Sequence, residues 1–126
     1  MSKSLTAALI IIGNEILSGR TQDKNLNFLA NELGSMGIQL MEVRVIPDIE
    51  STIIDTVNTL RNSFSYVFTT GGIGPTHDDI TSASVAKALN MELYRHPEAV
   101  ERLRGYYASD DELTDARLKM ADVPSG

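Results

Sequence analysis

The feature of the sequence that most limits the fold is an uninterrupted aliphatic run near its start. Residues 5–12 read LTAALIII, and a run without polar alternation is typical of a strand that is covered on both faces. Two more apolar segments, residues 38–46 and 66–68, predict further strands, and Pro47 ends the first of these. Amphipathic helical patterns lie between and after them, at residues 21–36, 49–60 and 79–89. Strands that alternate with helices predict an α/β fold with a mostly parallel sheet and helices on both faces.

Capping residues suggest where the helices begin and end. Asp23 and Gly37 bracket the first helix, and Asp48 or Ser51 can cap the second. Further along, the sequence predicts a short strand at 91–94, a helix from Pro97 through Tyr107, and a helical piece at 113–120. The last residues, ADVPSG, read as a turn.

The number of predicted strands is low for such a sheet. Doubly wound sheets have five or more strands in most cases, whereas this chain has three clear ones. We therefore expect residues 1–126 to form a single domain that lacks its last strands.

Composition excludes several classes of partner. The chain has 17 acidic and 11 basic residues, a net charge of −6, and no basic stripe, which argues against nucleic acid or an anionic membrane as partner. It has no cysteine, so disulfides and thiolate sites are excluded. The N-terminal apolar run is too short to span a bilayer and reads as a strand rather than a signal peptide. We expect a cytoplasmic protein.

Two loops follow strands at positions where open parallel sheets bind ligands. The first covers residues 13–20, GNEILSGR, and the second covers residues 69–81, TTGGIGPTHDDIT. Ligands bind beyond the carboxyl ends of parallel strands, at the point where the strand order reverses. If the strand order is 2-1-3, the two loops are neighbours and form one crevice.

The second loop combines glycines with adjacent carboxylates. Gly71, Gly72 and Gly74 permit positive φ and close approach of a ligand, and backbone N–H groups before a helix form an anion nest. Asp78 and Asp79 would repel a phosphate on their own. They are compatible with phosphate if Mg²⁺ lies between, since this ion takes one or two carboxylates together with phosphate oxygens.

Structural interpretations of the same residues remain open. Asp78 or Thr76 could cap the following helix, and Gly71–Gly72 could form a plain tight turn. In the first loop, Glu15 could cap a helix or bind metal, and Arg20 could hold a phosphate or be a surface charge.

An ordinary dinucleotide-binding domain is a further hypothesis that the residues disfavour. After Gly72 and Gly74, His77 stands where the third glycine of that fingerprint would be, and residues 44–47, RVIP, supply no acid at the end of the second strand. A P-loop is disfavoured as well, because its lysine is absent from the loop.

Taken together, the two loops resemble those of the molybdopterin-binding domain family. The similarity is carried by residues 13–19, by Asp23 and Asn25, and above all by residues 69–81. Within the family the chain is most similar to the N-terminal domain of CinA-like (competence/damage-inducible) proteins, and more distantly to the molybdenum-cofactor proteins MoaB and MogA. The resemblance implies a three-layer α/β/α domain in which both loops face one crevice, and a homo-oligomer, trimer or dimer, in the full-length protein.

The resemblance also implies chemistry. In the family the crevice holds a pterin or an adenine nucleotide phosphate with Mg²⁺. Some members adenylylate molybdopterin, and CinA-type domains are associated with hydrolysis of ADP-ribose-type pyrophosphates. Carried over to this sequence, ligand binding falls to Gly71, Gly72, Gly74, Thr76, Ser18 and Asn14; metal binding to Asp78 and Asp79; and catalysis to Asp78, Asp79 and Glu15.

The sequence departs from the family pattern in two places. Asn14 stands where many relatives have an aspartate, so this position can recognise a base or pterin through its amide but adds no charge for a metal. The family domain also continues for some tens of residues past a VPSG-like turn. A non-catalytic pterin- or nucleotide-binding or assembly module is therefore the alternative to an enzyme.

Overall fold

A three-stranded parallel sheet forms the centre of the molecule. The computed structural model describes residues 5–107 and 109–125. Strands β1 (Leu5–Ile12), β2 (Ile38–Ile46) and β3 (Tyr66–Thr70) pair in the order β2-β1-β3. The strand order and the parallel pairing are as predicted, and β3 runs two residues further than the apolar segment indicated.

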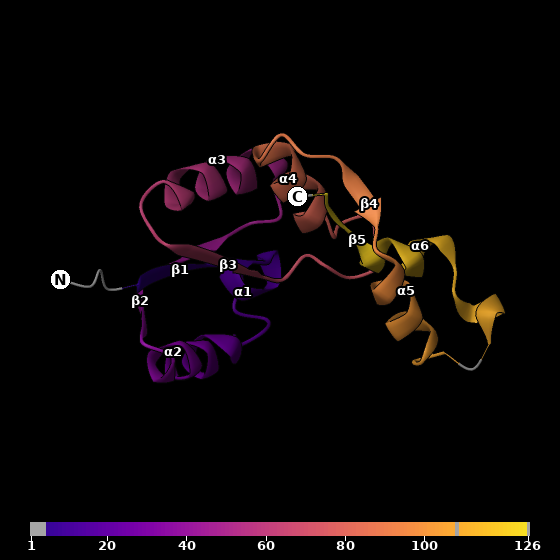
Figure 1. The fold of residues 1–126 in the computed structure, drawn as a ribbon, viewed down its shortest axis with the longest axis horizontal. Coiled ribbons are helices and arrows are strands. Elements are labelled where there is room, and N and C mark those ends of the chain that lie inside the picture. Colours follow the sequence, from indigo (N-terminus) through magenta and orange to yellow (C-terminus); the bar gives the residue numbers. More distant parts are fainter. Residues whose placement is uncertain (1–4, 108, 126) are drawn as a thin grey trace.

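Helices cover both faces of this sheet (Figure 1). Helix α2 (Asn25–Ser35) lies on one face, and α3 (Glu50–Arg61) and α4 (Thr81–Ala88) lie on the other. Strand β1 is buried between them: from Ala7 to Ile12 no residue is more than 3% exposed. Its even-numbered positions pack with α3 in the main core, which contains Ala8, Ile10, Ile12, Ile46, Ile53, Val57 and Leu60. The aliphatic run is therefore a strand covered on both faces, as predicted.

The helix starts differ from the predicted ones. Asp23 accepts the N–H of Leu26 (3.0 Å) at the start of α2, as a capping residue does. Neither Asp48 nor Ser51 caps α3, whose N-cap position is Ile49 with no side-chain bond. That prediction was wrong because the carboxylate of Asp48 instead accepts the N–H of Asn14.

Helix α4 begins two residues later than predicted. Its N-cap position is Ile80, with no side-chain bond, so neither Thr76 nor Asp78 caps it. The segment before Thr81 is taken up by hydrogen bonds between Thr76 and Asp79.

The remaining elements form a lobe at one side of the sheet, drawn in orange and yellow in Figure 1. We call residues 93–107 and 109–125 the C-terminal lobe. Strands β4 (Leu93–Arg95) and β5 (Asp122–Pro124) pair antiparallel, and an Arg95–Asp122 ion pair of 2.9 Å joins them. Between the strands lie α5 (Pro97–Arg104), the 3₁₀ turn η1 (Asp110–Glu112), α6 (Asp115–Leu118) and the 3₁₀ turn η2 (Lys119–Ala121). Strand β5 was predicted as a turn, and α5 ends three residues earlier than predicted.

Within the described ranges, no helix combines the length and apolar character needed to cross a membrane.

Candidate functional site

Three loops meet at the carboxyl edge of the sheet. Strand β1 leads through Gly13 into the short helix α1 (Asn14–Leu17), β2 leads into Asp48, and β3 leads into residues 71–80. The N–H of Gly13 donates to the carbonyl of Ile46 (3.0 Å), which continues the parallel pairing past the strand ends. This edge is where parallel sheets bind ligands.

A reciprocal pair of hydrogen bonds joins the first two loops. The backbone N–H of Asn14 donates to Asp48 Oδ2 (3.1 Å), and the backbone N–H of Asp48 donates to Asn14 Oδ1 (3.3 Å). Each side chain therefore satisfies the backbone of the other loop. The Asn14 amide oxygen is used in this contact, while its NH₂ group has no role in it.

A cavity of about 330 Å³ lies between the first loop and the third. Its lining residues are Asn14, Glu15, Arg20, Asp48, His77, Asp78 and Ile80. Three carboxylates thus face one guanidinium, and His77 Nε2 lies 3.3 Å from Asp78 Oδ1. The two loops that the sequence singled out share this crevice, as the 2-1-3 strand order predicted. The lining favours a cation, or a cation together with an anion held by Arg20.

A second cavity adjoins this one through Glu15. It measures about 370 Å³ and is lined by Ile11, Ile12, Glu15, Ile16, Thr21, Gln22, Asp23, Lys24, Asn25 and Gly71. The aliphatic ends of β1 and α1 make this compartment less polar than the first. The crevice therefore offers a charged part and a partly apolar part, joined at one carboxylate.

The glycines after β3 are required by the packing of the corner. Gly71 has φ +89°, and a Cβ there would lie 2.0 Å from the carbonyl oxygen of Ile12. Gly72 has φ +65°, and a Cβ would lie 2.2 Å from Thr81 Oγ1. Thr81 can approach both glycines closely: its hydroxyl donates to Gly71 O (2.9 Å), and its N–H donates to Gly72 O (3.0 Å). The tight-turn interpretation accounts for both glycines, and their role toward phosphate stays a prediction.

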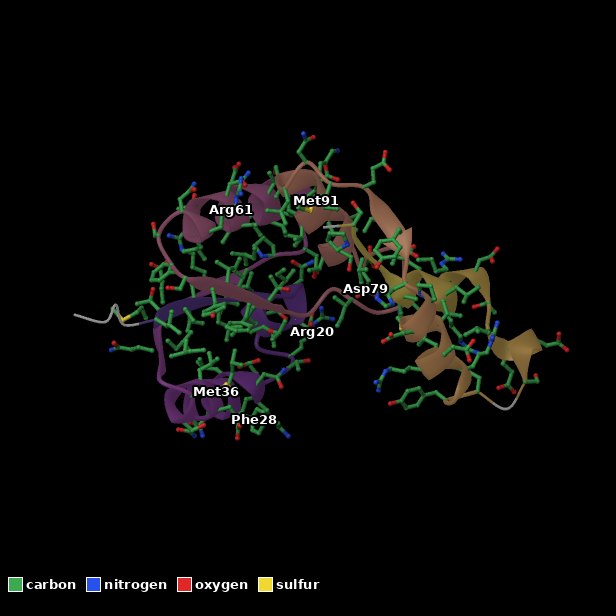
Figure 2. The ribbon with its side chains drawn as sticks, viewed as in Figure 1. Arg20, Phe28, Met36, Arg61, Asp79 and Met91 are labelled. Carbon is green, nitrogen blue, oxygen red and sulfur yellow. The ribbon has the colours of Figure 1, made fainter. Side chains whose placement is uncertain are left out.

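The two adjacent aspartates face different surroundings. Asp78 lines the charged cavity, whereas Asp79 lines a separate space of about 40 Å³ together with Gly72, Gly74 and Lys119. Asp79 Oδ2 accepts both the N–H (3.0 Å) and the hydroxyl (2.8 Å) of Thr76. Figure 2 shows Asp79 near the junction of the sheet and the C-terminal lobe.

These contacts also set the charge state of Asp79. Partial burial acts to raise its pKa, but the bonds from the Thr76 hydroxyl and amide, from the Gly74 amide, and the charge of Lys119 together lower the pKa below its ordinary value of 3.8. Asp79 is therefore a carboxylate at neutral pH.

The other predicted residues take supporting positions. Ser18 Oγ donates to the Glu15 carbonyl (3.3 Å) and accepts from Arg20 Nε (3.2 Å), so it orients the guanidinium at the edge of the crevice. Thr76 is held by Asp79 and by the Lys119 ammonium, which donates to its carbonyl. The ligand-binding roles predicted for Ser18 and Thr76 stay predictions.

The sequence did not identify every residue of the crevice. Asp48 was predicted only as a possible helix cap and His77 was given no role in the site, yet both line the charged cavity. The available signal was position: Asp48 follows the carboxyl end of a parallel strand, as Asn14 does.

The donor set fits Mg²⁺ that arrives with a phosphate better than a metal held by protein alone. Among the described residues, no three His, Cys, Asp or Glu side chains are arranged to hold an ion. The carboxylates of Glu15, Asp48 and Asp78 are hard oxygen donors, and Mg²⁺ in nucleotide sites takes one or two of these, with water and phosphate oxygens completing the shell. Glu15 and Asp78 line the charged cavity, whereas Asp79 does not; the metal role predicted for Asp78 and Asp79 stays a prediction.

Comparison with known proteins places the chain in a family. Residues 8–123 match the family model described as "Probable molybdopterin binding domain". The chain belongs to this family. The predicted resemblance is thereby confirmed: the domain is molybdopterin-binding-like and similar to CinA, and it shares its fold with MoaB.

Individual relatives agree with the assignment. A CinA-like protein of Sulfurihydrogenibium is 34% identical over 123 residues, which cover 97% of this chain and 31% of that protein. A protein of Pyrobaculum calidifontis is 38% identical over 122 residues, covering 96% of this chain and 47% of that protein. The chain spans about half the length, or less, of the curated relatives it matches.

Solved structures show the same fold. CinA of Thermoplasma acidophilum superposes with a TM-score of 0.84 at 33% identity, over 95% of this chain and 71% of that one. MoaB of Pyrococcus furiosus, a tungsten-cofactor-synthesizing protein, gives a TM-score of 0.63 at 24% identity, over 84% and 64%. At that identity the likeness concerns the fold alone.

Proposed function

We propose that the crevice binds the phosphate end of an adenine nucleotide or pterin together with Mg²⁺, and that the domain supports phosphoanhydride chemistry there. The observation that carries the proposal is the convergence of Asn14, Glu15, Asp48 and Asp78 with one guanidinium, Arg20, in a single cavity at the carboxyl edge of the sheet. An anion and a divalent cation can bind there side by side, because each finds a partner of opposite charge.

The two compartments suggest how a ligand lies in the crevice. The charged cavity suits the phosphates, and the adjoining space by Ile12, Ile16 and Gly71 suits a planar ring. Two cavities of about 330 and 370 Å³ fall within the range that holds a small ligand. The substrate classes proposed are ADP-ribose-type pyrophosphates and, as the alternative, molybdopterin with an adenylyl donor.

For a pyrophosphate, the reaction is hydrolysis. Water attacks one phosphorus, the P–O–P bond breaks, and Asp78 or Glu15 accepts the proton of the water. Bound Mg²⁺ supplies neutralisation of the phosphate oxygens. Arg20, oriented by Ser18, binds the phosphate that carries the developing charge.

The test is a ligand screen by thermal shift and calorimetry with ADP-ribose, ATP, AMP and molybdopterin, with and without Mg²⁺. We expect Mg²⁺-dependent stabilisation by one class of ligand. Asp78→Asn and Glu15→Gln should weaken binding by roughly tenfold each, equivalent to about 1.4 kcal/mol. Asp55→Asn, an exposed carboxylate on α3, is the matched control and should bind like the wild type. Binding that is equal in all four proteins would refute the proposed site.

One observation favours a second candidate, a binding module without catalysis. Arg20 lines the cavity and is oriented by Ser18, so the chain itself supplies a cation that can hold a phosphate without a metal. In that case chelation of Mg²⁺ leaves the affinity unchanged, and ADP-ribose is not hydrolysed at any metal concentration.

A further inference from the structure

Thr76 is the point at which the glycine-rich loop is held from two sides. Asp79 accepts its N–H and its hydroxyl, and the N–H of Asp79 donates to its carbonyl (3.1 Å). The same carbonyl accepts from the ammonium of Lys119. All three polar groups of Thr76 are therefore occupied, and one of the partners comes from a residue far along the chain.

Lys119 belongs to the C-terminal lobe rather than to the sheet. It lies in η2, directly before β5, and it is half-buried. The small space that it lines is bordered by Gly72, Gly74 and Asp79 from the loop, by Ser82 and Ala83 from α4, and by Leu93, Met120 and Asp122 from the lobe. Figure 2 shows Asp79 close to the seam between these parts.

The size of this space indicates that Lys119 and Asp79 have a structural role there rather than a ligand-binding one. Pockets for small ligands measure about 300 Å³ or more, whereas this one measures about 40 Å³. It has no room for a nucleotide or pterin. The contacts of Lys119 and Asp79 therefore act on the loop itself, not on a ligand in that space.

Residues next to Thr76 in the chain face the charged cavity. His77 and Asp78 line it, and Thr76 immediately precedes them. We propose that Lys119 is a positioning residue, which fixes Thr76 from the C-terminal lobe and so sets where His77 and Asp78 lie in the crevice. The crevice is complete only while the lobe is docked against the loop.

The expected effect of Lys119 on ligand affinity rests on the proposed function, whereas its effect on the position of the loop does not. The test therefore has a ligand-free readout: amide exchange of Thr76 and Asp79, followed by NMR in the full chain. Lys119→Met keeps the side-chain length and removes the donor. We expect exchange at these two amides at least about fivefold faster than in the wild type, while amides of β1 are unchanged.

Two variants serve as controls. Lys119→Arg retains a charged donor and should restore exchange to within about twofold of the wild type. Lys87→Met removes an exposed lysine near the end of α4 that pairs with Glu50 of α3 at 2.8 Å and should leave Thr76 and Asp79 unaffected. Unchanged exchange at both amides in Lys119→Met would overturn the proposal.

Ligand binding is the second readout. Where the wild type binds ADP-ribose with Mg²⁺, Lys119→Met should weaken binding by about threefold to tenfold and Lys119→Arg should rescue it. If the wild type binds none of the ligands in the screen, the proposed function fails, and the exchange data still decide the role of Lys119.

A measurement on the wild type covers the case in which Lys119→Met does not fold. Amine-reactive labelling, read by mass spectrometry, compares Lys119 with the exposed Lys24 and Lys87. A hydrogen-bonded, half-buried ammonium should react at least about fivefold more slowly. Equal rates at the three lysines would exclude the contact.

Discussion

Asn14 shows how one residue can serve the fold and limit the chemistry. Its side-chain oxygen accepts the N–H of Asp48, and an aspartate could accept the same bond. The asparagine thus keeps the contact between the two loops while leaving the cavity with three carboxylates instead of four. Fewer like charges lower the repulsion between side chains, at the cost of a weaker attraction for a cation.

Asn14→Asp should therefore bind Mg²⁺ more tightly in the presence of nucleotide. An added charge near Glu15 and Asp78 contributes roughly 1 kcal/mol, which corresponds to about a fivefold gain. Calorimetric titration of Mg²⁺ measures it, and Asn27→Asp on the exposed side of α2 serves as the control. Weaker Mg²⁺ binding in Asn14→Asp than in the control would contradict the metal role of this cavity.

The charge of Asp79 makes the stability of the fold depend on pH. Burial acts to raise its pKa, but the bonds from Thr76 and Gly74 and the charge of Lys119 together hold the pKa in the folded protein below the ordinary value. Because the pKa is lowered, the carboxylate contributes its full stabilisation at any pH well above the pKa of an aspartate in the unfolded chain, about 3.9. This contribution is lost as the pH falls through the pKa of Asp79 in the folded protein.

Urea unfolding of the wild type and Asp79→Asn measures the contribution. At pH 7 the wild type should be more stable, by up to about 1 kcal/mol for a partly exposed group. The difference should shrink as pH falls below about 4. A difference that stays constant from pH 7 to pH 3 would show that the charge of Asp79 does not matter to the fold.

At the level of the elements, the glycine at the corner after β3 and the glycine in α2 have opposite effects on stability. Gly71 has positive φ and no space for a Cβ, whereas Gly34 lies inside a helix with nothing within 4 Å of the Cβ position. The first is needed for the turn from strand to helix. The second only adds freedom to the unfolded chain.

The two alanine substitutions should therefore change stability in opposite directions. Gly71→Ala should destabilise by about 2–4 kcal/mol, because it combines a clash with a left-handed backbone. Gly34→Ala should stabilise by roughly 0.5–1 kcal/mol through helix propensity. Thermal unfolding of both variants provides the comparison, and a neutral Gly71→Ala would mean that the corner can relax.

The elements also show what sequence reasoning can recover. The bounds of β1 follow from its aliphatic run, since only a strand covered on both faces buries every residue in succession. Those of β2 follow from apolar residues that alternate with polar ones up to Pro47. The start of α4 could not be read, because Asp79 bonds Thr76 rather than capping a helix. Strand β5 was missed because three residues ending in a proline, Asp122–Pro124, carry no apolar signal and are ordered by pairing with β4.

The sequence predicted only part of the candidate site, for a related reason. Asn14, Glu15 and Asp78 stand in loops whose position follows from the strand order. Asp48 and Lys119 act through contacts between segments distant in the chain. Spacing along a sequence does not record such contacts.

At the level of the whole molecule, the surface of α2 bears on assembly. Phe28, on α2, is 67% exposed, and Met36, directly after the end of this helix, is 65% exposed. Met41, on the edge strand β2, is 55% exposed. Figure 2 places Phe28 and Met36 on the side of the sheet opposite α3. Contiguous exposed apolar patches are typical of an interface, and we expect the predicted homo-oligomer to use the side of the sheet that bears α2.

Sedimentation equilibrium tests the prediction. The wild-type chain should associate, and Phe28→Ser should shift the equilibrium toward monomer by about tenfold in dissociation constant. Tyr106→Ser removes an aromatic that is 84% exposed in the C-terminal lobe and should have no effect. A wild type that is monomeric at all concentrations would contradict the expected oligomer.

The central place of β1 has a consequence for how the chain is synthesised and folds. Strand β1 pairs on both sides, and it leaves the ribosome before both of its partners, which begin at Ile38 and Tyr66. Until those segments emerge, LTAALIII is an unpaired, uncharged strand, the kind of segment that invites aggregation. Parallel pairing across such separations also slows folding toward the millisecond-to-second range. Pulse-labelling exchange should therefore show β1 amides becoming protected together with those of β3, and a nascent chain cut before residue 66 should depend on chaperones.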